Sequence, residues 1–189
     1  MAARPVTVAI TGGIAAGKSA ALAAFARHGA ATASSDTVVH DLLPHDQDVR
    51  AAIRERWGAD AVGDRARIGE IVFADPGELA WLESLLHPRT RDAVDAWAAQ
   101  VDAAVAVVEI PLLYETGGES RFDAVVVITA PAETRAARRA PGDGRESRLI
   151  PDEEKVARAD YSYVNDGSLE ALDAFVGDVL EKLSSSSAG

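Results

Sequence analysis

Eight residues near the start of the chain read Gly12-Gly13-Ile14-Ala15-Ala16-Gly17-Lys18-Ser19. They match the phosphate-loop pattern G-x-x-x-x-G-K-[ST] at every fixed position. Residues 6–10 are rich in β-branched side chains, which predicts a buried strand before the loop. Residues 19–28 are Ala-rich and are followed by Gly29, which predicts a helix after it. A strand, a Gly-rich turn and a helix in this order give the context in which backbone N–H groups converge on an anion.

The residue types in this stretch point to a nucleotide triphosphate and a metal ion. We expect Lys18 to neutralise charge on the β- and γ-phosphates and the Ser19 hydroxyl to ligate Mg²⁺. Such a loop alone could serve a GTPase, an ATPase or a kinase. Our expectation for this chain is ATP as phosphoryl donor and Mg²⁺ as cofactor. The residues expected to contact ATP here are Gly13, Ile14, Ala15, Ala16, Gly17, Lys18, Ser19 and Ala20.

The rest of the chain alternates strand-like and helix-like segments. Further strands are predicted at 31–34, 104–110, 122–129 and 161–164, and helices at 132–140, 152–160 and 169–183. An interrupted helical block covers residues 48–100. Within it we expect one helix to end at Leu86 and another to begin at Pro88, so that His87 lies between them. The order predicts the α/β class, a doubly wound parallel sheet of the P-loop kinase type.

We expect one domain over residues 1–183 with a flexible tail at 184–189. Within it we expect a helical acceptor-binding insertion at about 37–100 and a short lid at about 136–155. The formal net charge of −11 disfavours nucleic acid as a partner. No apolar stretch approaches the length of a membrane helix, and the absence of cysteine fits the cytoplasm. The sequence leaves the oligomeric state open.

Two carboxylates follow predicted strands. Asp36 comes just after the second strand, where it could take a proton from an acceptor hydroxyl or orient that hydroxyl. The alternative role for Asp36 is the N-cap of a helix that begins at Thr37. Glu109 ends the central strand, where it could hold Mg²⁺ through water.

The chain resembles dephospho-coenzyme A kinases, a family within the nucleoside-monophosphate-kinase-like group, from about residue 6 to 172. Any one of the shared motifs is weak, but their order and spacing together are fairly specific. They are Thr11 to Ser19, Ser35-Asp36, Trp57-Gly58-Ala59-Asp60, Asp64-Arg65, Ile71-Val72-Phe73, Leu86-His87-Pro88, Pro111-Leu112-Leu113-Tyr114-Glu115, Ala159-Asp160 and Asn165-Asp166-Gly167-Ser168.

The resemblance implies phosphorylation of the ribose 3′-hydroxyl of dephospho-coenzyme A, with Asp36 as the base. It implies acceptor contacts from His87, Pro111, Leu112 and Glu115, although core packing is an equal alternative for Leu112 to Tyr114. Asn165 and Gly167 would lie beside the adenine of ATP, through backbone contacts. The lid would supply cations to the transferred phosphoryl group, and the candidates are Arg138, Arg145 and Arg148.

The chain departs from the family pattern at three places. Ser34 stands where the second strand usually ends in Asp, His40 stands where Arg is common, and the lid is shorter by roughly one to two helical turns. Because lid arginines stabilise transferred charge and exclude water, a short lid bears on turnover more than on binding. Two alternatives therefore stay open: a kinase for another nucleotide-like acceptor, and a diverged nucleotide-binding protein with little turnover.

Overall fold

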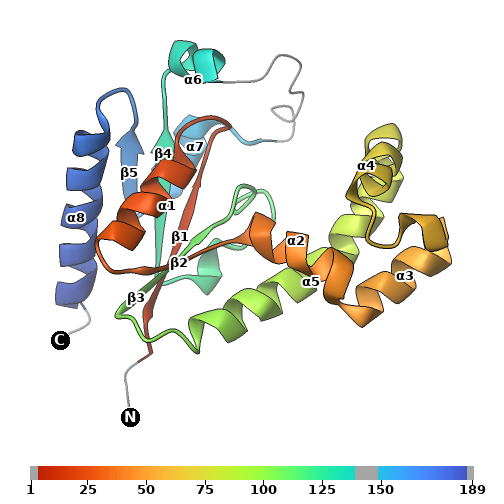
Figure 1. Cartoon of the computed structure of the whole chain (residues 1–189). Helices are drawn as coiled ribbons and strands as arrows, with labels where there is room; N and C mark the ends of the chain where they lie inside the picture. The colour runs from red at the N-terminus through yellow and green to blue at the C-terminus, as the bar shows by residue number, and fades with distance from the viewer. Residues whose placement is uncertain (1–3, 139–148, 187–189) are drawn as a thin grey trace. The chain divides into compact units, whose positions relative to one another are not determined.

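The structure, a computed structural model, describes residues 4–138 and 149–186. Five strands form one sheet in the order β2-β3-β1-β4-β5, and every neighbouring pair is parallel (Figure 1). Strands β2 and β3 lie on one side of β1, and the later strands β4 and β5 lie on the other. The strand order therefore reverses at β1, and ligands bind at the carboxyl end of the strands at such a point. The strands are β1 Val6–Gly12, β2 Ala31–Ser34, β3 Val105–Glu109, β4 Ala124–Thr129 and β5 Tyr161–Val164.

This arrangement confirms the predicted doubly wound parallel sheet. Helices α1 and α8 lie side by side over one face of it (Figure 1). Helix α7 and the loop after β3 contribute to the opposite face. The helical elements that accompany the sheet are α1 Lys18–Arg27, η2 Glu119–Arg121, α6 Ala132–Arg138, α7 Asp152–Arg158 and α8 Leu169–Ser186.

The three central strands β1, β3 and β4 are mainly apolar and buried because both faces of the sheet are covered there. In β4, Val126 and Ile128 pack into the core formed with α1 and α8, whereas Val125 and Val127 pack with Leu113 on the other face. This is the alternation of a pleated strand, with each face taking every second residue. Burying one such side chain stabilises the fold by about 1.5–3 kcal/mol relative to leaving it exposed.

Contacts divide the chain into two compact units, one of residues 1–34 and 98–189 and the other of residues 35–97. The second unit is helical and has an apolar core of its own, to which Val49, Ile53 and Leu82 contribute. Whether the chain is one domain with an insertion stays a prediction. The elements of this region are α2 Ser35–His45, α3 Gln47–Trp57, η1 Ala59–Ala61, α4 Arg65–Ala74 and α5 Pro76–Ala98.

One boundary expectation in the helical unit is wrong. His87 and Pro88 do not separate two helices, because α5 runs through them without a break. A proline inside a helix removes one N–H donor, which here would have met the Ser84 carbonyl. The Arg89 guanidinium donates to the neighbouring Leu85 carbonyl at 2.9 Å, and Leu82 and Leu86 anchor the same turn in the core.

The start of α2 also differs from the expectation. The helix begins at Ser35, so Asp36 lies in its first turn rather than in the capping position. Within the described ranges the Asp36 carboxylate makes no hydrogen bond to a backbone N–H, so the structure does not support the capping role. True caps stand elsewhere: Asp46 accepts from the Val49 N–H at 2.9 Å, and Asp64 accepts from the Arg67 N–H at 3.0 Å.

Among the helices of residues 4–138 and 149–186, none is long and apolar enough to cross a membrane.

A surface cluster at the start of β1 predicts how stability depends on pH. Asp123 accepts two bonds from the Arg4 guanidinium, at 2.6 and 2.8 Å, and further bonds from the N–H and hydroxyl of Thr7. The Arg4 bonds are the largest cause that lowers the pKa of Asp123 from 3.8 to about 2. Since the folded-state pKa is depressed, the stabilisation is complete above the ordinary pKa and is lost as pH falls toward 2.

We therefore expect Asp123→Asn to lower the melting temperature by a few degrees at pH 7. The variant should also weaken the fall in melting temperature between pH 4 and pH 2, because one of the groups that titrates there is gone. Thermal unfolding followed by circular dichroism across this range measures both effects. A variant whose curve runs parallel to that of the unchanged protein would show that Asp123 contributes nothing to acid denaturation.

Candidate active site

The loop after β1 has the backbone conformation of an anion-binding turn. Gly12 and Gly17 have φ angles of +143° and +101°, in the region that favours glycine. A Cβ at Gly12 would lie 1.9 Å from the Ile128 carbonyl oxygen, and one at Gly17 would lie 2.1 Å from Nδ2 of Asn165. Ala15 also has a positive φ, +59°. For a residue with a side chain this costs roughly 1–2 kcal/mol, so the loop holds one strained residue.

The Asn165 side chain supports the loop from behind. Its Nδ2 donates to the Ala16 carbonyl at 2.8 Å, and its backbone N–H donates to the Thr129 carbonyl at 2.7 Å. Asn165 is buried, and buried polar groups are normally hydrogen-bonded. Its two bonds therefore tie the phosphate loop at Ala16 to the end of β4 at Thr129. Sequence reasoning placed Asn165 beside ATP through backbone contacts and missed this side-chain role. The adenine contacts of Asn165 and of the exposed Gly167 stay predictions.

Lys18 opens α1 and turns back over the loop. Its ammonium donates to the carbonyl oxygens of Gly13 at 2.9 Å and of Gly12 at 3.3 Å. These bonds hold a positive charge at the mouth of the turn, beside the positive end of the α1 dipole. An anion bound by the loop would therefore meet a cation and backbone donors together.

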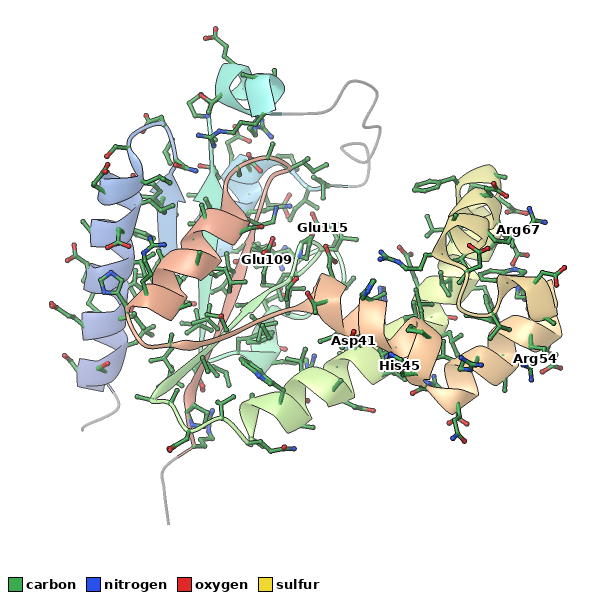
Figure 2. The ribbon with its side chains drawn as sticks, viewed as in Figure 1. Asp41, His45, Arg54, Arg67, Glu109 and Glu115 are labelled. Atoms are coloured by element: carbon green, nitrogen blue, oxygen red, sulfur yellow. The ribbon has the colours of Figure 1, made fainter. Side chains whose placement is uncertain are left out.

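Ser19 and Glu109 lie together across the strand edge. The Ser19 hydroxyl donates to the Glu109 carboxylate at 3.2 Å, although the two residues are far apart in sequence. Glu109 ends β3, which pairs directly with β1, and Figure 2 shows it at that end. A hydroxyl and a carboxylate oxygen are the donors that Mg²⁺ prefers, and one carboxylate suffices where phosphates and water complete the shell. The pair thus fits the predicted metal site.

Three charged side chains border the loop. The Arg135 guanidinium lies 3.5 Å from the Asp152 carboxylate, and a Cβ at Gly13 would lie 3.0–3.1 Å from both side chains. The exposed Arg138 reaches the Ala15 carbonyl at 3.5 Å. Arg138 is therefore near the loop, as expected of a lid cation. The other two candidates, Arg145 and Arg148, lie outside the described residues.

A cavity of about 720 Å³ opens at the carboxyl ends of β4 and β5. It lies between the start of α6 and the start of α7, and Arg135 and Asp152 belong to its wall together with apolar groups. Because these two side chains also border Gly13, the cavity adjoins the phosphate loop. The remaining residues that line it are Thr129, Ala130, Pro131, Ala132, Leu149, Ile150, Pro151, Glu153, Val156 and Val164.

The loop after β3 is partly core and partly surface. Leu113 and Tyr114 are buried and belong to the core on this face of the sheet, so core packing is their role. Pro111 and Leu112 are half-buried. Glu115 lies in the same loop (Figure 2), and its carboxylate is 2.8 Å from the ammonium of Lys155, a fully buried residue of α7. Sequence reasoning missed Lys155. Acceptor contacts by Pro111, Leu112 and Glu115 stay predictions.

Two predicted residues belong to the helical unit of residues 35–97. Asp36 is exposed in the first turn of α2, and it follows Ser34, the last residue of β2, by two positions. Two residues span at most about 7 Å, so the backbone itself keeps Asp36 near the carboxyl end of β2. His87 is half-buried within α5.

Comparison with known proteins gives one consistent result. A family model described as dephospho-CoA kinase matches residues 6–171. A dephospho-CoA kinase of Mesorhizobium japonicum is 37% identical over 193 residues, which cover 94% of this chain and 96% of that protein.

Solved structures agree with the sequence relatives. A Thermus thermophilus protein has a TM-score of 0.79 and 30% identity over 96% of this chain and 99% of its own. A dephospho-CoA kinase from Campylobacter jejuni has a TM-score of 0.71 and 25% identity, covering 96% of this chain and 98% of its own. The similarity thus extends over both compact units.

Proposed function

The chain belongs to the dephospho-coenzyme A kinase family, and from this premise we propose that it transfers the γ-phosphoryl group of ATP to the 3′-hydroxyl of dephospho-coenzyme A. The product is coenzyme A, so the reaction is the last step of its biosynthesis. The observation that carries the proposal is the complete phosphate loop with Ser19 bonded to Glu109, in a chain that matches the family over residues 6–171. We place the reaction in the cytoplasm, which suits a chain without cysteine.

On the donor side, the loop from Gly13 to Ala20 binds the phosphates of ATP through its backbone donors. Lys18 already holds its ammonium against Gly12 and Gly13, so little rearrangement is needed to reach a phosphate oxygen. Groups that are positioned before reaction stabilise developing charge without a reorganisation cost. Arg138, which lies near Ala15, is the described candidate for a cation on the transferred group.

Ser19 and Glu109 would hold Mg²⁺, Ser19 directly and Glu109 through water. Bound there, the ion neutralises charge on the β- and γ-phosphates. The present bond between the two residues keeps both oxygens at the mouth of the loop. We therefore propose that the Ser19 hydroxyl gives up its hydrogen bond to Glu109 when it binds Mg²⁺.

On the acceptor side, Asp36 is proposed to accept the proton of the 3′-hydroxyl. The hydroxyl oxygen forms a bond to the γ-phosphorus in line with the breaking bond to the β-phosphate oxygen, and ADP leaves. Asp36 suits this role because it is exposed, and within residues 4–138 and 149–186 its carboxylate has no hydrogen bond or ion pair that would occupy it. The residues proposed to bind the acceptor are His87, Pro111, Leu112 and Glu115.

An acceptor panel tests the function. We expect dephospho-coenzyme A to be phosphorylated faster than AMP, CMP or shikimate. AMP and CMP also have a ribose 3′-hydroxyl, but only dephospho-coenzyme A joins it to a pantetheine arm. ADP release in a coupled assay, measured at equal acceptor concentrations, gives the ranking. Turnover of any of the other three that equals or exceeds that of dephospho-coenzyme A would assign the chain to a different acceptor.

A second readout separates transfer from hydrolysis. Coenzyme A formed per ADP released should fall below one if the short predicted lid admits water to the site. The rate of ADP release in the absence of acceptor gives the background of ATP hydrolysis. A ratio of one at a rate of roughly 1–100 s⁻¹ would show that the lid is sufficient as it stands.

A further inference from the structure

Helix α7 lies beside both loops that the proposed function uses. At its first residue, the Asp152 carboxylate pairs with Arg135 beside Gly13 of the phosphate loop. Three residues later, Lys155 pairs with Glu115 in the loop after β3. Three residues later again, Arg158 pairs with Glu119 and lies 4.4 Å from the ring centroid of Tyr114. One short helix therefore borders the phosphate loop on one side and is tied by ion pairs to the loop after β3 on the other.

The central pair is the unusual one. Lys155 has a side-chain exposure of 0% and Glu115 of 10%, and lysine is almost never fully buried unless it is paired. The ammonium lies 2.8 Å from Oε1 of Glu115, close enough for an ion pair although the two are not aligned as a hydrogen bond. The same Oε1 accepts the Ile150 backbone N–H at 3.1 Å. Glu115 thus connects the loop after β3 to Ile150, just before α7, and to Lys155 within α7.

Such a pair is costly to maintain for stability alone. Two buried charges lose their hydration, and well-packed apolar residues of the same volume often serve a core as well or better. A buried ion pair does fix the relative position of the two segments that carry it, because the two charges must lie next to each other. The segment it directs is the loop that carries Pro111 and Leu112, which are half-buried at the carboxyl edge of the sheet.

We propose that Lys155 is a positioning residue for phosphoryl transfer, which acts through Glu115 on the loop that binds the acceptor. The inference rests on the proposed function, because it assumes that this loop contacts dephospho-coenzyme A. Lys155 is fully buried and so cannot touch the acceptor itself. Any effect of Lys155 on the acceptor must therefore pass through the position of the loop.

The test uses Lys155→Met, which keeps the length of the side chain and removes its charge. We expect kcat/KM for dephospho-coenzyme A to fall by about 10²-fold, the effect of a small misplacement of a bound reactant. The affinity for ATP, measured by calorimetric titration, should stay within about twofold, since Lys18 and the phosphate loop are unchanged. Arg27→Met is the control: it breaks the Arg27 and Asp173 pair, whose side chains are 57% and 35% exposed, and should leave both quantities unchanged.

The double variant Lys155→Met with Glu115→Gln carries the same test if the single variant does not fold, because it leaves no unpaired buried charge. If Lys155 acts through Glu115, the double variant should be no worse than the more impaired single variant. If instead the losses of the two single variants multiply, Lys155 does not act through Glu115, and the proposal is overturned. Lower thermal stability with an unchanged kcat/KM for the acceptor would overturn it as well, by showing a merely structural pair.

The unmodified chain separates this inference from the function on which it rests. If it does not phosphorylate dephospho-coenzyme A, the proposed function fails and the inference falls with it. If it does, and the Lys155 variants have the same kcat/KM for dephospho-coenzyme A as the unmodified chain, the inference alone fails.

Discussion

Lys18→Ala is expected to remove most of the ATP affinity of the chain. The ammonium lies against the carbonyl oxygens of Gly12 and Gly13, where a bound phosphate would meet it. A hydrogen bond between charged groups contributes about 1.5–3 kcal/mol, which corresponds to a Kd weaker by roughly 10- to 10²-fold. Phosphoryl transfer should fall further, because negative charge moves toward the leaving oxygen as the bond breaks.

Calorimetric titration with ATP and Mg²⁺ measures the binding effect. Lys182→Ala is a matched control, since it removes the same charge from an exposed residue of α8. The control should bind ATP as the unchanged protein does, whereas a general effect of net charge would weaken both variants alike. Equal ATP affinity in Lys18→Ala and the unchanged chain would contradict the assignment of the loop.

The centre of the sheet could be predicted because its three central strands each carry a local signal. Residues 6–10, 104–110 and 122–129 are apolar runs too short for helices and bounded by polar or Gly-containing stretches. Strands that are buried on both faces are continuous apolar runs, so they can be identified in the sequence without knowing which strands they pair with. The break expected at Pro88 was wrong because local propensity competes with packing, and Leu82 and Leu86 hold the helix together across the proline.

The site was predictable where the chemistry lies within one motif. The phosphate loop needs glycine, lysine and serine at fixed spacing, so Gly12, Lys18 and Ser19 identify it without a structure. The Asn165 and Lys155 side chains could not be assigned in this way, because their partners lie far away in the sequence. The only hint at Lys155 in the sequence was that lysine is rare in this chain, which has three.

Asp36→Asn is expected to lower kcat by about 10²- to 10⁴-fold, the usual contribution of a positioned base. Asparagine has the same shape but cannot take the proton of the acceptor hydroxyl. The ATP affinity should stay nearly unchanged, because the donor side depends on residues 13–20. Stability should also change little, since Asp36 is exposed and does not cap α2. A pre-steady-state measurement of the first turnover isolates the chemical step from product release.

Asp41→Asn provides the matched control for this prediction. Asp41 is also exposed, lies on the same helix (Figure 2) and undergoes the same chemical change, but it is five positions further from the end of β2. Its kcat should equal that of the unchanged protein. A normal rate in Asp36→Asn would show that the carboxylate is not the base. Because the capping role is not supported either, orientation by Lys18 and the metal ion would then have to suffice for attack.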